Sequence, residues 1–214
     1  MQFFSLFSSL DYGWAKLMSG LQNGFLNGFF KYYSVLFDKG LIILAAAIAL
    51  VLFKRTRRLA LNMALCVMVA FAISLVLKTS FDRPRPFADT ASDYYTWWVA
   101  AGSNKASNTG SFPSGHATVA FSFAVALIVS LNKKYDWIGF LFAFLAGVAR
   151  TYLMVHYLSD VLMGLVVGLV GGALGALLTR SLFDLADKHK DKKFFAFCLD
   201  FSVVNLFKKS PDEQ

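Results

Sequence analysis

The amino-acid sequence predicts an all-α membrane protein, a polytopic bundle of five transmembrane helices preceded by amphipathic helices at the membrane surface. Of the 214 residues, 57% are hydrophobic and only 16% are charged, whereas a soluble domain is roughly a quarter charged. The apolar residues fall in long blocks, and basic residues cluster at the ends of those blocks. Both patterns are typical of membrane spans and their cytoplasmic loops. At this length we expect one domain.

The first 34 residues differ from the rest of the chain. Aromatic residues and leucines alternate with Ser, Gly, Asn and Lys, and Phe25, Phe29 and Tyr32 recur at helical spacing. This pattern predicts one or two amphipathic helices lying in the membrane interface. A sixth span in this segment is the alternative.

Five apolar blocks are candidates for membrane-spanning helices, each of which needs about 20 residues. They cover residues 35–53, 59–77, 114–131, 137–155 and 157–178. The first block is the weakest, because Asp38 and Lys39 interrupt it and residues 41–53 alone are too short. We therefore expect a transmembrane unit over residues 35–180, between the interfacial segment 1–34 and a basic tail 181–214.

The last block contains small residues at four-residue spacing. Gly164, Gly168 and Gly172 form one row, and Gly171 and Gly175 form a second. Such rows allow helix backbones to approach closely, so we expect them to serve packing.

The distribution of basic residues predicts on which side of the membrane each loop lies. They fill the turns after the first and third blocks and follow the fifth, at Lys54, Arg55, Arg57, Arg58, Lys133, Lys134, Arg180 and the lysine-rich tail. The positive-inside rule makes these segments cytoplasmic. The long loop 79–113 and the turn near His156 then lie together on the extracytoplasmic side of the plasma membrane. In the tail, residues 188–193 are a charged run and residues 194–207 are expected to form a short amphipathic helix.

Composition also argues against several classes of function. The net charge of +8 lies at the ends of apolar blocks, which indicates a membrane protein and no nucleic-acid partner. Cys66 and Cys198 lie in different kinds of segment, so no disulfide framework is expected. There is no Cys/His cluster with zinc spacing and no basic n-region with a cleavage site, so we expect neither a metal site nor a removable signal peptide.

Cationic residues gather at the extracytoplasmic ends of the predicted helices, where polar residues are costly. Lys78 ends the second block, Arg85 follows it, and Arg150 lies near the end of the fourth. Arginine forks match phosphate oxygens with two hydrogen bonds. The three cations together therefore indicate an anion site.

The starts of two helices face the same side. Ser114, Gly115 and His116 follow Pro113 and open the third block. Free N–H groups and the helix dipole favour an anion there, and Gly115 allows the backbone to come close to a ligand.

A second histidine lies at the start of the fifth block. His156 and Asp160 are four residues apart, on one helical face. A carboxylate so placed can hold a histidine tautomer and stabilise its cation. His156 is therefore a candidate nucleophile, with His116 as the acid–base partner.

Each of these features has an ordinary explanation when taken alone. A single Lys or Arg at a helix end usually reaches to the lipid headgroups, a single interfacial His is usually solvated, and a His/Asp pair is often local support. Their convergence on one face favours a site.

The order and spacing of these residues resemble the three signatures of the type 2 phosphatidic acid phosphatase superfamily. In the first signature, six residues separate Lys78 from Arg85-Pro86, and the second signature is Pro-Ser-Gly-His at residues 113–116. In the third, five residues separate Arg150 from His156, and three residues separate His156 from Asp160. The resemblance covers about residues 35–180. Ala149 departs from it, since a Ser often stands there.

The resemblance implies a helical-bundle enzyme that works through a covalent phosphohistidine without a metal or cofactor. It implies His156 as nucleophile, Asp160 as its support and His116 as the acid that protonates the leaving group. The implied phosphate-binding residues are Lys78, Arg85, Ser114, Gly115 and Arg150. Arg83-Pro84 duplicates Arg85-Pro86; spacing from Lys78 selects Arg85, and Arg83 is left as a candidate ligand for a second phosphate.

A site at the membrane boundary suits a lipid phosphate substrate. The aromatic run Tyr94-Tyr95-Thr96-Trp97-Trp98 is explained either as an anchor at headgroup level or as a gate for the lipid. The compact frame is similar to bacterial undecaprenyl diphosphate phosphatases, so we expect undecaprenyl diphosphate. Phosphatidylglycerophosphate, phosphatidic acid and lipid A phosphates are the alternatives.

Other classes of function fit less well. A transporter would spread its charges across the membrane depth, whereas here they collect at one face. An inactive scaffold would tolerate a broken signature, whereas here every catalytic position of the signatures is filled. Soluble vanadium haloperoxidases share the anion site, but the five predicted membrane spans argue against that activity. The oligomeric state is not predicted.

Overall fold

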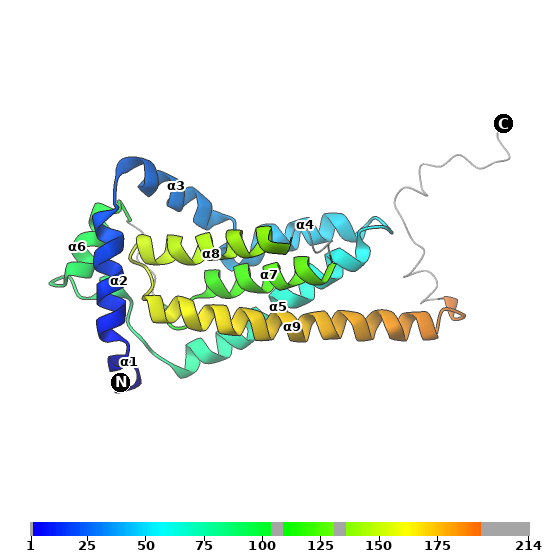
Figure 1. Cartoon of the computed structure of the whole chain (residues 1–214). Helices are drawn as coiled ribbons and strands as arrows, with labels where there is room; N and C mark the ends of the chain where they lie inside the picture. Colours follow the sequence, from blue (N-terminus) through cyan, green and yellow to red (C-terminus); the bar gives the residue numbers. More distant parts are fainter. Residues whose placement is uncertain (1, 104–108, 131–135, 194–214) are drawn as a thin grey trace.

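The structure, a computed structural model, describes residues 2–103, 109–130 and 136–193. Within these ranges all regular secondary structure is helical (Figure 1), which confirms the predicted all-α class. The predicted tail helix over residues 194–207 and the basic pair Lys133 and Lys134 lie outside the described residues.

A bundle of roughly aligned helices forms the body of the molecule (Figure 1). Helix α9 packs against both α5 and α7, and α7 also packs against α5 and α8. The bundle consists of α4 (Leu41–Val51), α5 (Arg57–Ser80), α7 (Gly115–Ser130), α8 (Asp136–Tyr152) and α9 (Leu158–Lys188).

The lengths and surfaces of these helices are those of a membrane protein. Among the described residues, α5 and α9, with 24 and 31 residues, are long and apolar enough to cross a bilayer, and α4, α7 and most of α8 are shorter apolar helices. Large apolar side chains lie exposed on the outer faces, for example Met68, Phe144 and Val170. Such an apolar exterior is suited to lipid.

The predicted first span is not one continuous helix. Helix α3 (Gly24–Val35) ends where that span was expected to begin, and the 3₁₀ turn η1 (Asp38–Gly40) separates it from α4. Gly40 has φ of 70° and lies against Val67 and Val119, a left-handed conformation that glycine adopts without penalty. The eleven residues of α4 extend about 16 Å, roughly half of the hydrocarbon thickness.

The N-terminal helices cover one end and one side of the bundle. After the short α1 (Gln2–Ser5), α2 (Ser8–Gly20) lies across the end of the bundle, and α3 returns along α8 (Figure 1). Neither helix has the length of a span. On α3 the rings of Phe25 and Tyr32 are 79% and 82% exposed, as the predicted interfacial position requires.

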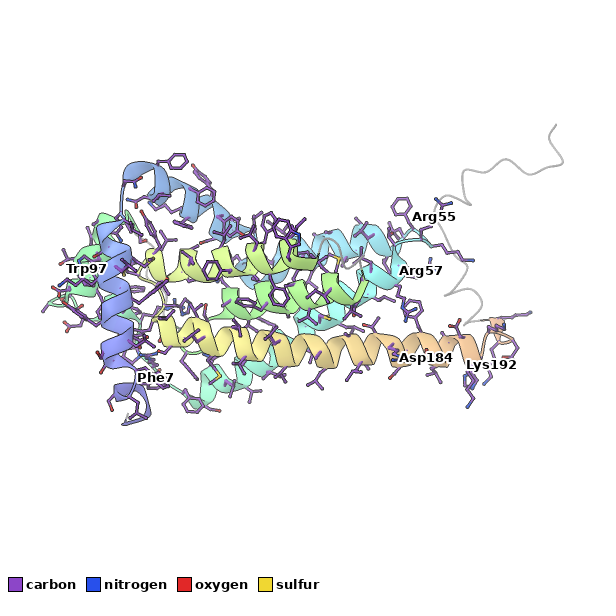
Figure 2. All side chains as sticks on the ribbon, viewed as in Figure 1. Phe7, Arg55, Arg57, Trp97, Asp184 and Lys192 are labelled. Carbon is purple, nitrogen blue, oxygen red and sulfur yellow. The ribbon has the colours of Figure 1, made fainter. Side chains whose placement is uncertain are left out.

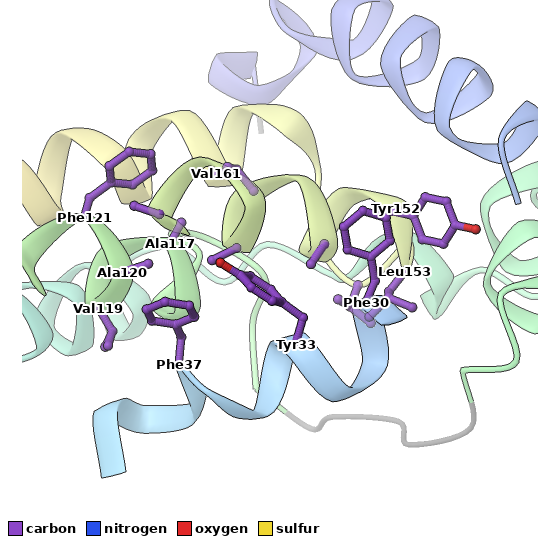
Figure 3. Close-up of a cluster of buried hydrophobic side chains, with 14 of the residues drawn as sticks. Phe30, Tyr33, Phe37, Ala117, Val119, Ala120, Phe121, Tyr152, Leu153 and Val161 are labelled. Atoms are coloured by element: carbon purple, nitrogen blue, oxygen red, sulfur yellow. The ribbon is translucent and has the colours of Figure 1, made fainter. Parts of the chain in front are cut away.

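The opposite face of α3 is buried against the bundle. Phe30 and Tyr33 lie among side chains of α7 and α8 (Figure 3). The Tyr33 hydroxyl donates to the carbonyl of Phe142 at 2.7 Å, and the Tyr152 hydroxyl donates to Asn27 at 2.8 Å. Helix α3 is therefore a fixed part of the fold.

The predicted loop between the second and third spans contains helical structure. It holds the turn η2 (Pro86–Ala88) and the helix α6 (Asp93–Ala100), which includes the aromatic run. Trp98 is buried, and its ring stacks on Phe87 with centroids 4.7 Å apart. At least this aromatic side chain packs inside the protein and does not reach the headgroups.

Charged residues mark the far end of the bundle. Arg55, Arg57, Asp184 and Lys192 lie at the end opposite to Phe7 and Trp97 (Figure 2). Helix α9 reaches this end because it continues to Lys188, beyond the predicted limit of its apolar block.

The glycines of α9 bring it into direct contact with two neighbours. A Cβ atom on Gly171 would lie 2.4 Å from the Ala70 Cα atom, and one on Gly175 would lie 2.5 Å from the Cys66 Cα atom, both on α5. On the side of α7, a Cβ on Gly164 would lie 2.7 Å from the carbonyl oxygen of Ser114. These contacts fix the position of α9 against α5 and α7.

We predict that Gly171→Ala destabilises the protein, because the added methyl group meets backbone atoms that cannot rotate away. Overpacking typically costs about 1–3 kcal/mol. The thermal unfolding midpoint in detergent should fall. Gly13→Ala is the matched control, since nothing lies within 4 Å of its added Cβ; an equal fall in both variants would contradict the close packing of α9.

Candidate active site

The extracytoplasmic ends predicted from the sequence meet around one cavity of about 280 Å³. The residues around it come from the end of α5, the α5–α6 connection, the start of α7, the end of α8 and the α8–α9 turn. Of the predicted site residues, those that line the cavity are Lys78, Arg85, Gly115, His116, Arg150 and His156.

Backbone carbonyl groups hold two of the three cations. The Lys78 ammonium donates to the Gly110 carbonyl at 2.7 Å. The Arg85 guanidinium donates from Nε to the Thr109 carbonyl at 3.0 Å and from Nη1 to the Val155 carbonyl at 2.9 Å. Both positive charges are thus held in place, and neither forms a salt bridge with an acidic side chain within residues 2–103, 109–130 and 136–193.

The third cation has unsatisfied hydrogen-bonding capacity. The Nε atom of Arg150 is buried, and no hydrogen-bond acceptor for it is found among the described residues. A buried donor of this kind is costly without a partner. An anion in the cavity is a natural partner for it.

His156 lies between Arg85 and Asp160. Its Nε2 atom is 3.4 Å from Arg85 Nη1, and its Nδ1 atom is 3.6 Å from Asp160 Oδ2. Because arginine can only donate, the lone pair of Nε2 lies on the side of Arg85. The proton belongs on Nδ1, which faces the carboxylate just beyond hydrogen-bond distance. Burial, aided by Arg85, Arg150 and Lys78, holds the pKa of His156 well below its ordinary value of 6.5, which keeps the imidazole neutral.

The start of α7 supplies the second histidine. Gly115 is the first residue of the helix, and His116 follows it into the cavity. Ser114 is fully buried and does not line the cavity; its backbone N–H donates to the Asp160 carbonyl at 3.0 Å, and its hydroxyl oxygen faces the Ala117 N–H at 3.5 Å. Ser114 therefore links α7 to α9 in this structure.

A comparison with protein families identifies the wider relationship. A model of the PAP2 superfamily matches residues 58–184. The chain belongs to the PAP2 superfamily. The matched segment contains every residue that the sequence placed in the anion site, and the suspected relationship is confirmed.

Individual PAP2 proteins similar to this chain have different named substrates. An undecaprenyl-diphosphatase of Sulfolobus acidocaldarius is 28% identical over 154 residues, 72% of this chain and 70% of that protein. A lipid A 4'-phosphatase of Bacteroides thetaiotaomicron is 28% identical over 178 residues, 75% and 74% of the two chains. The crystal structure of a transmembrane PAP2 type phosphatidylglycerolphosphate phosphatase from Bacillus subtilis matches with a TM-score of 0.61 at 25% identity, covering 87% of this chain and 88% of that one. The chain is thus a membrane lipid phosphatase of the PAP2 superfamily.

A second cavity of about 400 Å³ adjoins the first. The two share Asp38, His116, Arg150 and Val155 in their linings, and the second is also lined by Lys31 of α3. Asp38 Oδ1 lies 3.8 Å from His116 Nε2. From the sequence, Asp38 was expected only to interrupt a membrane span. Neither Asp38 nor Lys31 lies within the segment matched by the PAP2 model.

Arg83 does not line this cavity, in contrast to its suggested role as a ligand for a second phosphate. Its side chain is buried and bonded to Asp11, Ser159 and Asp160. It lines a separate pocket beside α2. Although only one residue, Pro84, separates Arg83 from Arg85 in the sequence, the two side chains lie in different parts of the structure.

Proposed function

We propose that this PAP2 protein hydrolyses a lipid diphosphate, most specifically undecaprenyl diphosphate to undecaprenyl phosphate, through a phosphohistidine and without a metal. The observation that carries the proposal is the cavity in which the cations Lys78, Arg85 and Arg150 surround the two histidines. The cations suit a phosphate group, and His156 presents a neutral nitrogen to it.

The proposed reaction has two steps. His156 Nε2 attacks the terminal phosphorus and forms the N–P bond. The bond from that phosphorus to the bridging oxygen breaks at the same time, and this oxygen, now part of the departing lipid phosphate, takes a proton from His116. Water then attacks the phosphohistidine, giving its proton to His116, and the N–P bond breaks to release phosphate. Asp160 stabilises the imidazolium character that His156 gains in the first step, while Lys78, Arg85, Gly115 and Arg150 hold the phosphate oxygens. Ser114, whose backbone N–H is bonded to the Asp160 carbonyl, holds the start of α7 against α9 and makes no phosphate contact in this mechanism.

We further propose five membrane crossings, with the cavity at the extracytoplasmic surface. The basic residues at the opposite end of the bundle support this orientation, and α4 with η1 would complete the crossing that begins at α3. A cysteine introduced at Ser103 in a variant lacking Cys66 and Cys198 should react with an impermeant thiol reagent in intact cells; protection there would reverse the orientation.

We predict that the purified protein releases phosphate from lipid phosphates in excess EDTA. No group of three or more metal-ligating side chains occurs among the described residues, and the cavity cations take the place that a metal would have. Vanadate should inhibit, because it mimics five-coordinate phosphorus. Undecaprenyl diphosphate should give a higher kcat/KM than phosphatidylglycerophosphate, phosphatidic acid or lipid A.

The same assay can refute each part separately. Activity lost in EDTA and restored by magnesium would exclude the metal-free mechanism. A preference for one of the other lipids would retain the phosphatase and replace its substrate. Absence of release from every lipid phosphate would reject the function itself.

We predict different roles for the two histidines. His156→Ala should abolish phosphate release from all substrates, because it removes the nucleophile. His116→Ala should slow leaving-group release from a lipid monophosphate more than release from the matching diphosphate, by an extra factor on the order of ten. The reason is that an alkoxide leaving group needs a proton more than a phosphate leaving group does.

A single-turnover burst of leaving-group release isolates this step from hydrolysis of the phosphohistidine. His189→Ala is the control, because His189 lies at the far end of α9. Equal losses for the two substrates with His116→Ala would show that His116 is not the leaving-group acid.

The second cavity supports a diphosphate in particular. A leaving group protonated by His116 departs on the side away from His156, and the adjoining cavity lies beside His116 and contains Lys31. A departing lipid phosphate would meet this cation there, whereas a departing lipid alcohol would have no charge to pair with it.

Lys31→Met should therefore lower kcat/KM for a lipid diphosphate by about fivefold, since an exposed charge pair contributes up to about 1 kcal/mol. The lipid monophosphate should be unaffected. Lys16→Met, an exposed lysine on α2, is the control for general loss of surface charge. A parallel loss for both substrates would exclude Lys31 from diphosphate recognition.

A further inference from the structure

Arg83 is the centre of a buried polar cluster behind the active site. Its Nη1 atom donates to Asp160 Oδ1 at 2.6 Å and to the Ser159 hydroxyl at 2.7 Å, and its Nη2 atom donates to Asp11 Oδ2 at 2.8 Å. The guanidinium carbon lies 4.4 Å and 3.9 Å from the ring centroids of Phe4 and Tyr157. Contacts with these rings add cation–π attraction and restrict the movement of the side chain.

Asp11 connects this cluster to the N-terminal helix α2. The residue is 2% exposed, an unusual environment for a carboxylate unless it is paired. Besides its bond to Arg83, Asp11 accepts from the Ser159 backbone N–H at 2.8 Å and from the Ser159 hydroxyl at 2.7 Å. The first N–H groups of a helix have no acceptor within that helix. At the start of α9, Asp11 of α2 accepts a hydrogen bond from one of them.

The cluster determines how the Asp160 carboxylate is oriented. Arg83 holds Oδ1, while Oδ2 accepts from the Tyr157 backbone N–H at 2.9 Å and faces His156 Nδ1. Each oxygen thus has its own anchor, and the one that faces His156 cannot exchange with the other without breaking the bond to Arg83.

Arg83 also separates two buried carboxylates. Asp11 and Asp160 are both bonded to its guanidinium. Without the guanidinium, both carboxylates would lose the hydrogen-bond donor that they share. The Asp160 carboxylate would then be free to turn away from His156.

We propose that Arg83 and Asp11 are positioning residues, which keep Asp160 oriented towards His156 and so make the N-terminal helix α2 part of the support of the active site. The inference rests on the proposed role of His156 as nucleophile. Neither residue touches the cavity that would hold the phosphate, so both act through Asp160.

The test is a double-mutant cycle on kcat/KM, measured with a lipid phosphate that the wild-type protein hydrolyses. Arg83→Met should lower kcat by about 10²-fold, the effect expected when a reacting group is misplaced by about 1 Å, with KM nearly unchanged because the cavity cations remain. In the Asp160→Asn background the same Arg83→Met change should cause little further loss, since groups that act through one another are not additive.

Asp11→Asn is the milder variant. It keeps the shape and an acceptor oxygen for Ser159 but removes the negative charge, so the Arg83–Asp160 pair remains. We expect a loss of several-fold, also absent in the Asp160→Asn background. This variant keeps the proposal testable if Arg83→Met does not fold. Arg180→Met, an exposed arginine of α9 paired at 3.8 Å with Asp184, is the matched control.

The outcomes separate a positioning role from a purely structural one. Rates are normalised to the amount of folded protein that binds vanadate. A structural role would lower the unfolding midpoint and leave kcat per vanadate-binding molecule unchanged, which would overturn the proposal. Full additivity with Asp160→Asn would overturn it as well. A wild-type protein without any phosphatase activity would instead refute the proposed function, so the two failures are distinguishable.

Discussion

Close contact of α9 with α5 and α7 determines where the chemistry of this protein lies. The glycine rows of α9 allow its backbone to touch both neighbours, and the Ser114 N–H completes the contact by donating to the Asp160 carbonyl. Because the three helices are locked side by side, their ends lie at fixed heights. Lys78, His116 and Asp160 therefore occupy the same level of the bundle although they come from segments far apart in the chain.

The second constraint is electrostatic. Three cations line one cavity at the end of an apolar bundle, and two of them are held by carbonyl groups, which orient a charge without cancelling it. The Asp160 carboxylate forms an ion pair with Arg83 and does not line the cavity, so it lies on the side of His156 away from the cavity. In the proposed mechanism this separation leaves the positive charge for the phosphate, while the negative charge of Asp160 supports His156 as the nucleophile.

The N-terminal helices have a larger part in the site than their composition indicates. Their aromatic and small polar residues predict a membrane anchor, and the exposed faces of α3 agree with that position. The buried face of α2 carries Asp11 to the start of α9, and Lys31 of α3 and Asp38 of η1 line the second cavity beside His116. Asp11 is an isolated acidic residue in such a segment, and nothing near it in the sequence indicates that it will bind Arg83 and Ser159. Its role therefore could not be inferred from the periodicity of the segment.

The all-α class, the apolar helices and the grouping of the anion-site residues follow from the sequence by itself, because apolar block length, basic loop residues and the residue spacing within each of the three motifs are all local patterns. Local patterns also determined that Arg85, rather than Arg83, has the spacing of the PAP2 signature. Tertiary structure alone decided what Arg83 does, why residues 35–53 break at Gly40, and that Ser114 faces α9 instead of the cavity. These features depend on which backbone or charge lies opposite each side chain, and that is set only when helices distant in sequence pack together.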